Sequence, residues 1–174
     1  ALLQRDGDIV SCFDGASPLT FSCVCPGNYY ISVKHRNHLG IMSANTIALS
    51  SAVASIDFSD PLTAVWVKPT YPSVITNLPR LIQGNKALLW GGDANVNKNG
   101  KYNGSSNDRE QILYDLGTWN PNDILYPTYK NSDLNMDGKV QYNHLNNDRN
   151  WLLYMIGIAS TPSTANYMLS QHTP

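Results

Sequence analysis

The chain has 174 residues, a formal net charge of −1 and 14% charged residues. A chain of this length forms one domain or two small ones and can bury a hydrophobic core. The near-neutral charge provides no basic surface for nucleic acid, and no run of 18 apolar residues is present that would span a membrane. The segment starting at Ala1 is not a signal peptide, so we expect a processed or excerpted chain.

Short apolar runs separated by turn signals occupy residues 1–90 and predict β-structure. The run 28–36 alternates clearly, which places Tyr29, Ile31 and Val33 on one face of a strand. About seven short strands with frequent turns predict an Ig-like β-sandwich over residues 1–90, with an irregular crossover at 68–85. The segments from which these strands are predicted are 2–3, 9–13, 19–25, 28–36, 39–43, 46–49, 54–58, 63–67 and 86–90.

Three cysteines lie in the first predicted strands. Cys12 could pair with Cys23 or Cys25 across neighbouring strands, which leaves one thiol over. A bond between Cys23 and Cys25 is unfavourable because side chains two apart in a strand do not meet in disulfide geometry. The sequence therefore leaves two alternatives open, one disulfide or buried free thiols.

The segment His35-Arg36-Asn37-His38 is the one cluster that could suggest catalysis, and we interpret it as a polar hairpin tip or as side chains stacked on a sheet face. The chain has no nucleophile motif, no glycine-rich phosphate loop and only one glutamate, Glu110. These features predict a protein that is not an enzyme.

An internal duplication dominates the second half of the chain. Residues 93–117 and 133–157, aligned without gaps at a shift of 40, are identical at ten of 25 positions, where chance would give roughly one or two. The identical pairs are Asp93/Asp133, Asn95/Asn135, Tyr102/Tyr142, Asn103/Asn143, Asn107/Asn147, Asp108/Asp148, Arg109/Arg149, Leu113/Leu153, Tyr114/Tyr154 and Gly117/Gly157.

Each copy opens with carboxylate and amide side chains at alternate positions, which turns their oxygens toward one point in a tight loop. Calcium takes 6–8 such oxygen ligands, whereas magnesium prefers water and phosphate partners. The second copy reads D-x-N-x-D-G, the start of a calcium loop. A single Asn- and Gly-rich segment could simply be a turn, but two copies in register favour two calcium sites.

The usual twelfth ligand of a calcium loop would fall on Gly104 or His144, neither of which can serve. The next acid in both copies is Asp108 or Asp148, so we predict a lengthened loop that this aspartate closes. The predicted ligands are Asp93, Asn95, Asn97, the backbone carbonyl of Asn99 and Asp108 in site one, and Asp133, Asn135, Asp137, the backbone carbonyl of Lys139 and Asp148 in site two. Site two has three carboxylates against two, which predicts tighter binding there.

Apolar spacing after each loop predicts one short helix per copy, ended by Gly117 or Gly157. The resulting organisation is a β-sandwich at 1–90, a duplicated calcium module at 91–157 and a tail at 158–174. The aromatic-rich segment 118–132 joins the two calcium units.

This pair of units resembles a dockerin-type calcium module found near the C-termini of large secreted surface proteins of Bacteroidetes-type bacteria. The segments 2–10, 26–40 and 47–50 resemble the same family, whereas Cys12, Cys23, Cys25, His144 and the tail depart from it. The residues that carry the resemblance are Leu89, Trp90, Gly92, Asp93, Ala94, Asn95, Tyr102, Gly104, Asn107, Asp108, Arg109, Ile112 and Leu113. The resemblance implies calcium binding and a secreted, cell-surface location.

In similar sequences another strand precedes the segment at residues 2–8, so we expect a sandwich that lacks its first strand. Such a groove accepts a strand from another chain, and the tail, with Tyr167 and Leu169, is a candidate donor. The leading hypothesis is a secreted calcium-binding structural subunit that assembles head-to-tail with copies of itself into an extracellular filament.

The alternative hypothesis is a dockerin-like or adhesive terminal module of a larger surface protein. Such a module would bind another surface protein or a glycan, and its candidate contact residues are Tyr29, Tyr30, Trp66, Trp119 and Tyr129.

Overall fold

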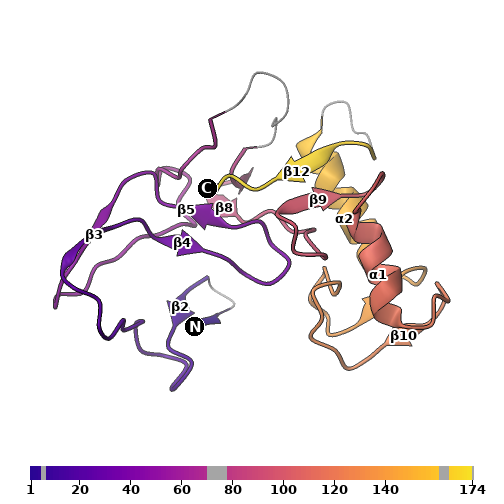
Figure 1. Cartoon of the computed structure of the whole chain (residues 1–174), viewed down its shortest axis with the longest axis horizontal. Coiled ribbons are helices and arrows are strands. Elements are labelled where there is room, and N and C mark those ends of the chain that lie inside the picture. The colour runs from indigo at the N-terminus through magenta and orange to yellow at the C-terminus, as the bar shows by residue number, and fades with distance from the viewer. Residues whose placement is uncertain (5–6, 70–77, 161–164, 174) are drawn as a thin grey trace.

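The computed structural model describes residues 1–4, 7–69, 78–160 and 165–173. The described residues form short strands and two short helices, so the predicted mainly-β class is confirmed. Figure 1 shows the strands of residues 1–49 on one side of the molecule and the two helices on the other. The strands of the first half are β1 (Leu2–Leu3), β2 (Ile9–Val10), β3 (Gly27–Tyr29), β4 (Ser32–Val33), β5 (Ile41–Met42), β6 (Ile47–Leu49), β7 (Leu81–Gln83) and β8 (Lys86–Leu88).

The Ig-like sandwich is not confirmed, because every sheet in the described residues consists of two antiparallel strands. The pairs in the first half are β1–β2, β3–β6, β4–β5 and β7–β8. The predicted strands at 19–25 and 54–58 are absent, and 63–67 contributes a single bridge between Ser43 and Val65. Asp57 and Asp60 accept backbone N–H groups from Ser59 and Leu62, and such local turns compete with strand pairing.

Residues 78–85 differ from the predicted irregular crossover, whereas the strand predicted at 86–90 is present as β8. The strands β7 and β8 form a hairpin whose turn contains Gly84 in the left-handed region, with φ of 61°. The rest of the predicted crossover, residues 70–77, lies outside the described residues. All three cysteines are free and exposed, so neither a disulfide nor buried thiols are found.

The second half contains strands β9 (Asn99–Lys101), β10 (Ile124–Leu125), β11 (Val140–Gln141) and β12 (Met168–Ser170), and helices α1 (Asp108–Leu116) and α2 (Asp148–Ala159). One helix per copy is therefore confirmed. Gly117 ends α1 in the left-handed conformation as predicted, but α2 continues through Gly157 and ends at Ser160. No helix in the described ranges has the length and apolar character needed to cross a membrane.

Both helices begin for the same reason. The side chains of Asn107 and Asn147 occupy the N-cap positions and accept the backbone N–H of Glu110 and Asn150 at 2.9 and 2.8 Å. An N-cap side chain satisfies one of the free N–H groups of the first turn. Each helix thus starts at the aspartate that follows the cap.

The hydrophobic core lies between the two helices and the two loops. Its buried members are Leu39, Trp90, Ala94, Ile112, Leu116, Leu134, Val140, Leu152, Ile156 and Leu169. Leu39 and Trp90 come from the predicted sandwich, and Leu169 comes from the predicted tail. The core therefore crosses both of the domain boundaries predicted from the sequence.

The strand that follows each helix pairs with the loop of the other copy. β10 follows α1 and pairs with β11 of the second loop, whereas β12 follows α2 and pairs with β9 of the first loop. Figure 1 shows β12 beside β9. The tail is therefore the second copy's equivalent of the segment that contains β10. At a shift of 44 residues, Asn122 and Leu125 match Asn166 and Leu169.

Candidate functional site

The first carboxylate of each loop is buried and organises the loop backbone around it. Asp93 accepts the N–H groups of Asn97 and Lys98 at 2.8 and 3.0 Å. Asp133 accepts those of Asp137 and Gly138 at 3.1 and 3.2 Å. The two bends are thus equivalent.

The loop backbone reaches these bends through left-handed conformations. Val96 and Lys98 have φ of 59° and 70°, and Met136 and Gly138 have φ of 59° and 81°. The left-handed position holds Gly138 in the second loop, whereas in the first loop Lys98 adopts the same conformation with a side chain.

The aspartate that begins each helix closes its loop. Asp108 accepts the N–H groups of Asn95 and Lys101 at 3.1 and 2.7 Å. Asp148 accepts those of Leu134 and Gln141 at 2.7 and 2.8 Å. The structure therefore brings the first and last predicted ligands of each site to the same loop, the last one at the positively polarised N-terminus of a helix.

The remaining predicted ligands lie between these two carboxylates. Asn95 and Asn135 accept the N–H two residues ahead, both at 3.1 Å, and their amides donate to the carbonyls of Ser106 and Asn146. Asn97 and Asp137 lie on the exposed side of each loop. Asn99 and Lys139, the predicted carbonyl donors, give their backbone N–H groups to the side chains of Asn97 and Asp137, both at 2.9 Å.

Among the four paired carboxylates, only Asp133 has an ion-pair partner within the described residues, Arg36 at 3.7 Å. Burial and, to a smaller extent, the carboxylate of Asp93 raise the pKa of Asp108 to about 7. Asp148 is shifted to a pKa of about 7 by burial and, to a smaller extent, by Asp133. In the described residues, no Lys or Arg forms an ion pair with Asp93, Asp108 or Asp148. A bound cation would relieve this unfavourable electrostatic energy.

The donor set fits a hard cation with oxygen ligands. Among the described residues, no three His, Cys, Asp or Glu side chains gather closely enough to hold a metal ion by themselves. Each loop offers two or three carboxylates, and a metal bound there would also use asparagine amides and backbone carbonyls. Such mixed oxygen sets are typical of calcium rather than of zinc.

Three other identical positions of the repeat also make equivalent contacts in the two copies. Arg109 stacks over the ring of Tyr102 at 5.0 Å, and Arg149 over Tyr142 at 4.8 Å. Asn103 donates to the side chain of Asn166, and Asn143 donates to that of Asn122. The duplication therefore preserves the contacts that surround each loop as well as the candidate ligands.

The predicted partner-binding residues lie inside the molecule. Leu169 is fully buried, and Tyr167 packs partly buried against the same core. Ser170 donates to the side chain of Asn99 at 3.2 Å, and Gln171 donates its N–H to the carbonyl of Lys98 at 3.0 Å. Pairing with β9 inside the chain thus replaces the free donor strand predicted from the sequence.

The tip of the β4–β5 hairpin contacts both loops, which the sequence did not predict. The backbone carbonyl of Asn37 accepts the N–H groups of Gly92 and Asp93 at 3.1 and 2.9 Å. Its side-chain amide donates to the carbonyls of Asn131 and Asp133, both at 2.8 Å. The interpretation as a hairpin tip is confirmed, but Asn37 is fully buried rather than exposed.

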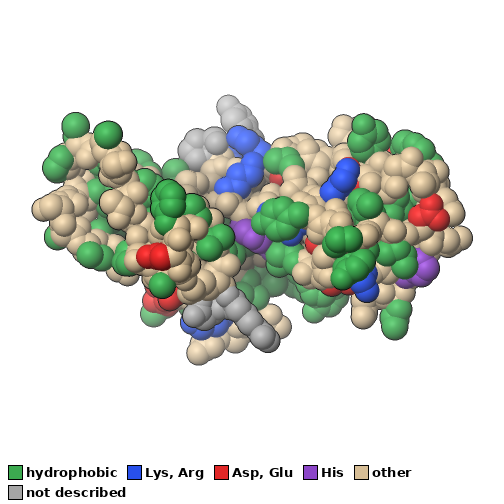
Figure 2. All heavy atoms as spheres, turned by 90° about the horizontal axis from the view of Figure 1, so that it is seen from below, with side chains coloured by type: hydrophobic (Ala, Val, Ile, Leu, Met, Phe, Trp, Pro, Cys, Tyr) green, Lys and Arg blue, Asp and Glu red, His purple; other side chains and the backbone are tan. Residues whose placement is uncertain are grey.

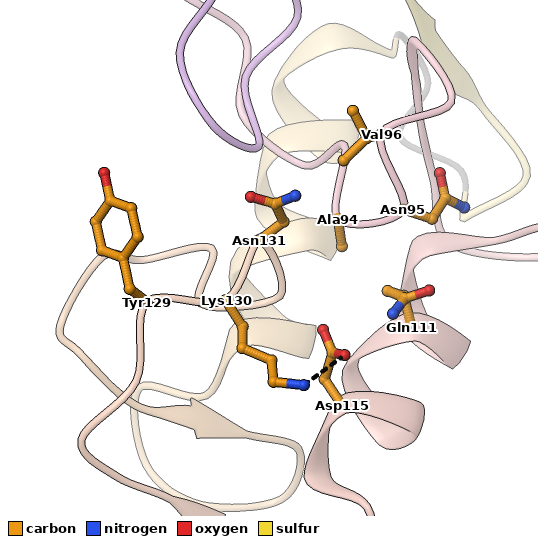
Figure 3. A pocket seen from close by; sticks show the side chains of 8 residues that line it. All are labelled: Ala94, Asn95, Val96, Gln111, Asp115, Tyr129, Lys130 and Asn131. Atoms are coloured by element: carbon orange, nitrogen blue, oxygen red, sulfur yellow. Dashed lines mark hydrogen bonds and ion pairs between the residues drawn. The ribbon is translucent and has the colours of Figure 1, made fainter.

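A polar hollow of about 350 Å³ opens beside the first loop (Figure 3). Loop and helix side chains line one side of it, and the Tyr129–Asn131 segment lines the other. Lys130 and Asp115 form an ion pair across the hollow at 3.2 Å. Figure 2 shows that charged side chains are otherwise few and well separated on the face it displays.

No protein-family model, no curated protein and no solved structure matches this chain.

Proposed function

We propose that the chain is a non-enzymatic calcium-binding structural module of a secreted or cell-surface protein, with one calcium ion in each loop. The observation that carries this proposal is the pair of buried carboxylates at each site, Asp93 with Asp108 and Asp133 with Asp148, held by equivalent hydrogen bonds. In the first loop neither carboxylate has an ion-pair partner among the described residues, and in the second loop only Asp133 has one, Arg36 at 3.7 Å. Burying two carboxylates beside each other with so little neutralisation is costly, and the repetition of this cost favours a bound cation in each loop.

The role of the ion follows from where the ligands lie. In each site the first ligands belong to the loop and the last belongs to the first turn of a helix. Calcium would therefore hold the loop against the helix and, through β9 and β11, against the strand that follows the other helix. An ion that binds only the folded chain stabilises it by about 2.7 kcal/mol at 100 times its Kd.

Thermal unfolding of the full chain in calcium and in EGTA tests the proposal. We expect the melting temperature to fall by several degrees in EGTA and to recover when calcium is restored. Magnesium at the same concentration should restore it poorly, because the loops offer an all-protein cage. Equal melting temperatures in calcium and EGTA would reject calcium binding.

The filament version of the proposal requires exchange of β12 between copies. Because β12 pairs with β9 of its own chain, a free donor strand would first have to leave the core that holds Leu169. Light scattering after size-exclusion chromatography in calcium separates the two cases. Regular polymers would support exchange, whereas a monomer would limit the proposal to a structural module.

A binding module remains a second candidate, favoured by the aromatic side chain of Tyr129 beside the hollow in Figure 3. Tyr129 is 77% exposed, and aromatic faces beside polar groups suit carbohydrate rings or protein partners. Glycan-array binding that is lost in Tyr129→Ala would support this function. An array without any signal would reject the glycan form of it.

A further inference from the structure

Asn37 joins the first residues of the two loops to each other. Its carbonyl accepts the N–H of Asp93, and its side chain donates to the carbonyl of Asp133. Each of these residues supplies the first candidate ligand of its loop. One buried residue therefore fixes both loop starts, the first through its backbone carbonyl and the second through its side chain.

Arg36 adds a second set of contacts at the same place. Its guanidinium donates to the carbonyl of Lys130 and lies 3.7 Å from the carboxylate of Asp133. It also stacks on Tyr129 at 3.9 Å. The hairpin tip thus contacts the backbone that enters the second loop, a candidate ligand of that loop and the aromatic ring beside it.

A hollow lies between parts of the two loops near their first ligands. Ala94, Asn95 and Val96 line one side of the hollow in Figure 3, and Lys130 and Asn131 line the other. The hydrogen bonds of Asn37 cross between these two segments, from residues 92–93 to residues 131–133. The hairpin tip is therefore a short route between the two sites.

We propose that the hairpin tip at Arg36–Asn37 couples the two calcium sites, so that an ion in one loop raises the calcium affinity of the other. This inference rests on the proposed calcium function. The first ion fixes one loop start and, through Asn37, restricts the other loop start as well. The second ion then loses less conformational entropy on binding, which produces positive cooperativity.

The test compares the wild-type chain with two single-site variants by calorimetric calcium titration. Asn97→Lys places a positive charge in site one, and Asp137→Lys does the same in site two. Both positions are exposed, so these variants keep the core intact. Independent sites would give wild-type binding equal to the sum of the two single-site curves. We expect the product of the two wild-type dissociation constants to be at least about fivefold smaller than that of the single-site constants.

The same comparison in an Asn37→Ala background tests whether the coupling between the two sites passes through Asn37. We expect both ions still to bind. The coupling factor, which is the product of the single-site dissociation constants divided by the product measured with both sites intact, should fall close to one. Because Asn37 is fully buried, Arg36→Gln provides a second background should the first variant not fold, and there we expect a factor about half of the wild-type value or less.

Three outcomes distinguish the coupling, the role of the hairpin tip and the proposed function from one another. Two ions that bind independently in the wild-type chain would overturn the coupling and leave the proposed function intact. Coupling that persists unchanged in the Asn37→Ala background, or in Arg36→Gln where the former does not fold, would overturn the role of the hairpin tip. Absence of calcium binding in the wild-type chain would overturn the proposed function itself.

Discussion

Leu169 of β12 lies directly opposite Gly100 of β9, within the first loop. A Cβ atom at Gly100 would lie 3.3 Å from Cδ1 of Leu169, so the absence of a side chain makes room for the buried leucine. In the other copy Leu125 lies opposite Val140, and Leu125 is only partly buried. At equivalent positions, one strand pair therefore combines a leucine with a glycine, and the other combines a leucine with a valine.

Leu169→Ala tests whether the C-terminal strand is part of the core. Removing this fully buried side chain should lower the free energy of unfolding by about 2–5 kcal/mol, through lost burial and a residual cavity. Urea unfolding followed by tryptophan fluorescence measures the change. Leu145→Ala is the control, because Leu145 is 88% exposed and its removal should cost little. Equal effects of the two substitutions would contradict the fold.

Asn107→Ala and Asn147→Ala test the equivalent helix starts. Each removes an N-cap side chain that accepts a backbone N–H, which should cost about 1 kcal/mol of stability. Asn107→Ser and Asn147→Ser retain a capping oxygen and should keep most of that stability. Chemical denaturation of the four variants gives the comparison, and alanine variants as stable as the serine variants would refute the caps.

Asn97→Asp tests the difference in charge between the two loops. Asn97 occupies the position that Asp137 has in the second loop, so the substitution gives site one a third carboxylate. We expect calcium affinity at site one to rise by roughly tenfold, equivalent to about 1.4 kcal/mol. The reciprocal change Asp137→Asn should weaken site two to a similar extent. Calcium titration that detects no change in either variant would argue against ligands at these positions.

The lowered pKa of His38 predicts a loss of folding stability in weak acid. Burial, together with the nearby positive charges of His35 and Arg36, lowers the pKa of His38 to about 4 from 6.5. Between these values the unfolded chain binds a proton that the folded chain does not, so stability is complete above pH 6.5 and falls as the pH drops toward 4.

The corresponding experiment measures urea unfolding in EGTA at several pH values between 7 and 4, a window set by the His38 shift. The contribution of His38 should reach about 2–3 kcal/mol at the acidic end. His38→Gln removes the titration, so the wild-type chain should lose more stability than the variant as the pH falls. Parallel losses in the two proteins would contradict the assigned shift.

Periodicity and duplication predicted the second half of the chain well because their signals are local. The presence of one helix after each loop and its apolar face follow from a few neighbouring residues. The end of α2 was predicted incorrectly, since Gly157 lies inside the helix and Ser160 ends it. Glycine favours a helix end without requiring one.

Long-range contacts explain what sequence reasoning missed. The equivalence of 122–125 and 166–169 is hidden by a shift of 44 instead of 40, because α2 is longer than α1. The contacts of Asn37 join residues more than 90 positions apart, and the local sequence contains no sign of them. In the first half, turn-forming aspartates interrupt runs that hydrophobicity alone predicts as strands.

The number of calcium ions bound per chain tests the central claim most directly. Calorimetric titration of the EGTA-stripped full chain with calcium chloride should give two ions per chain, in agreement with the two equivalent loops. The double variant Asp93→Asn, Asp133→Asn should bind far more weakly, since each loop loses its first carboxylate. A wild-type chain that binds no calcium at millimolar concentration, the weak end of protein calcium sites, would contradict the account.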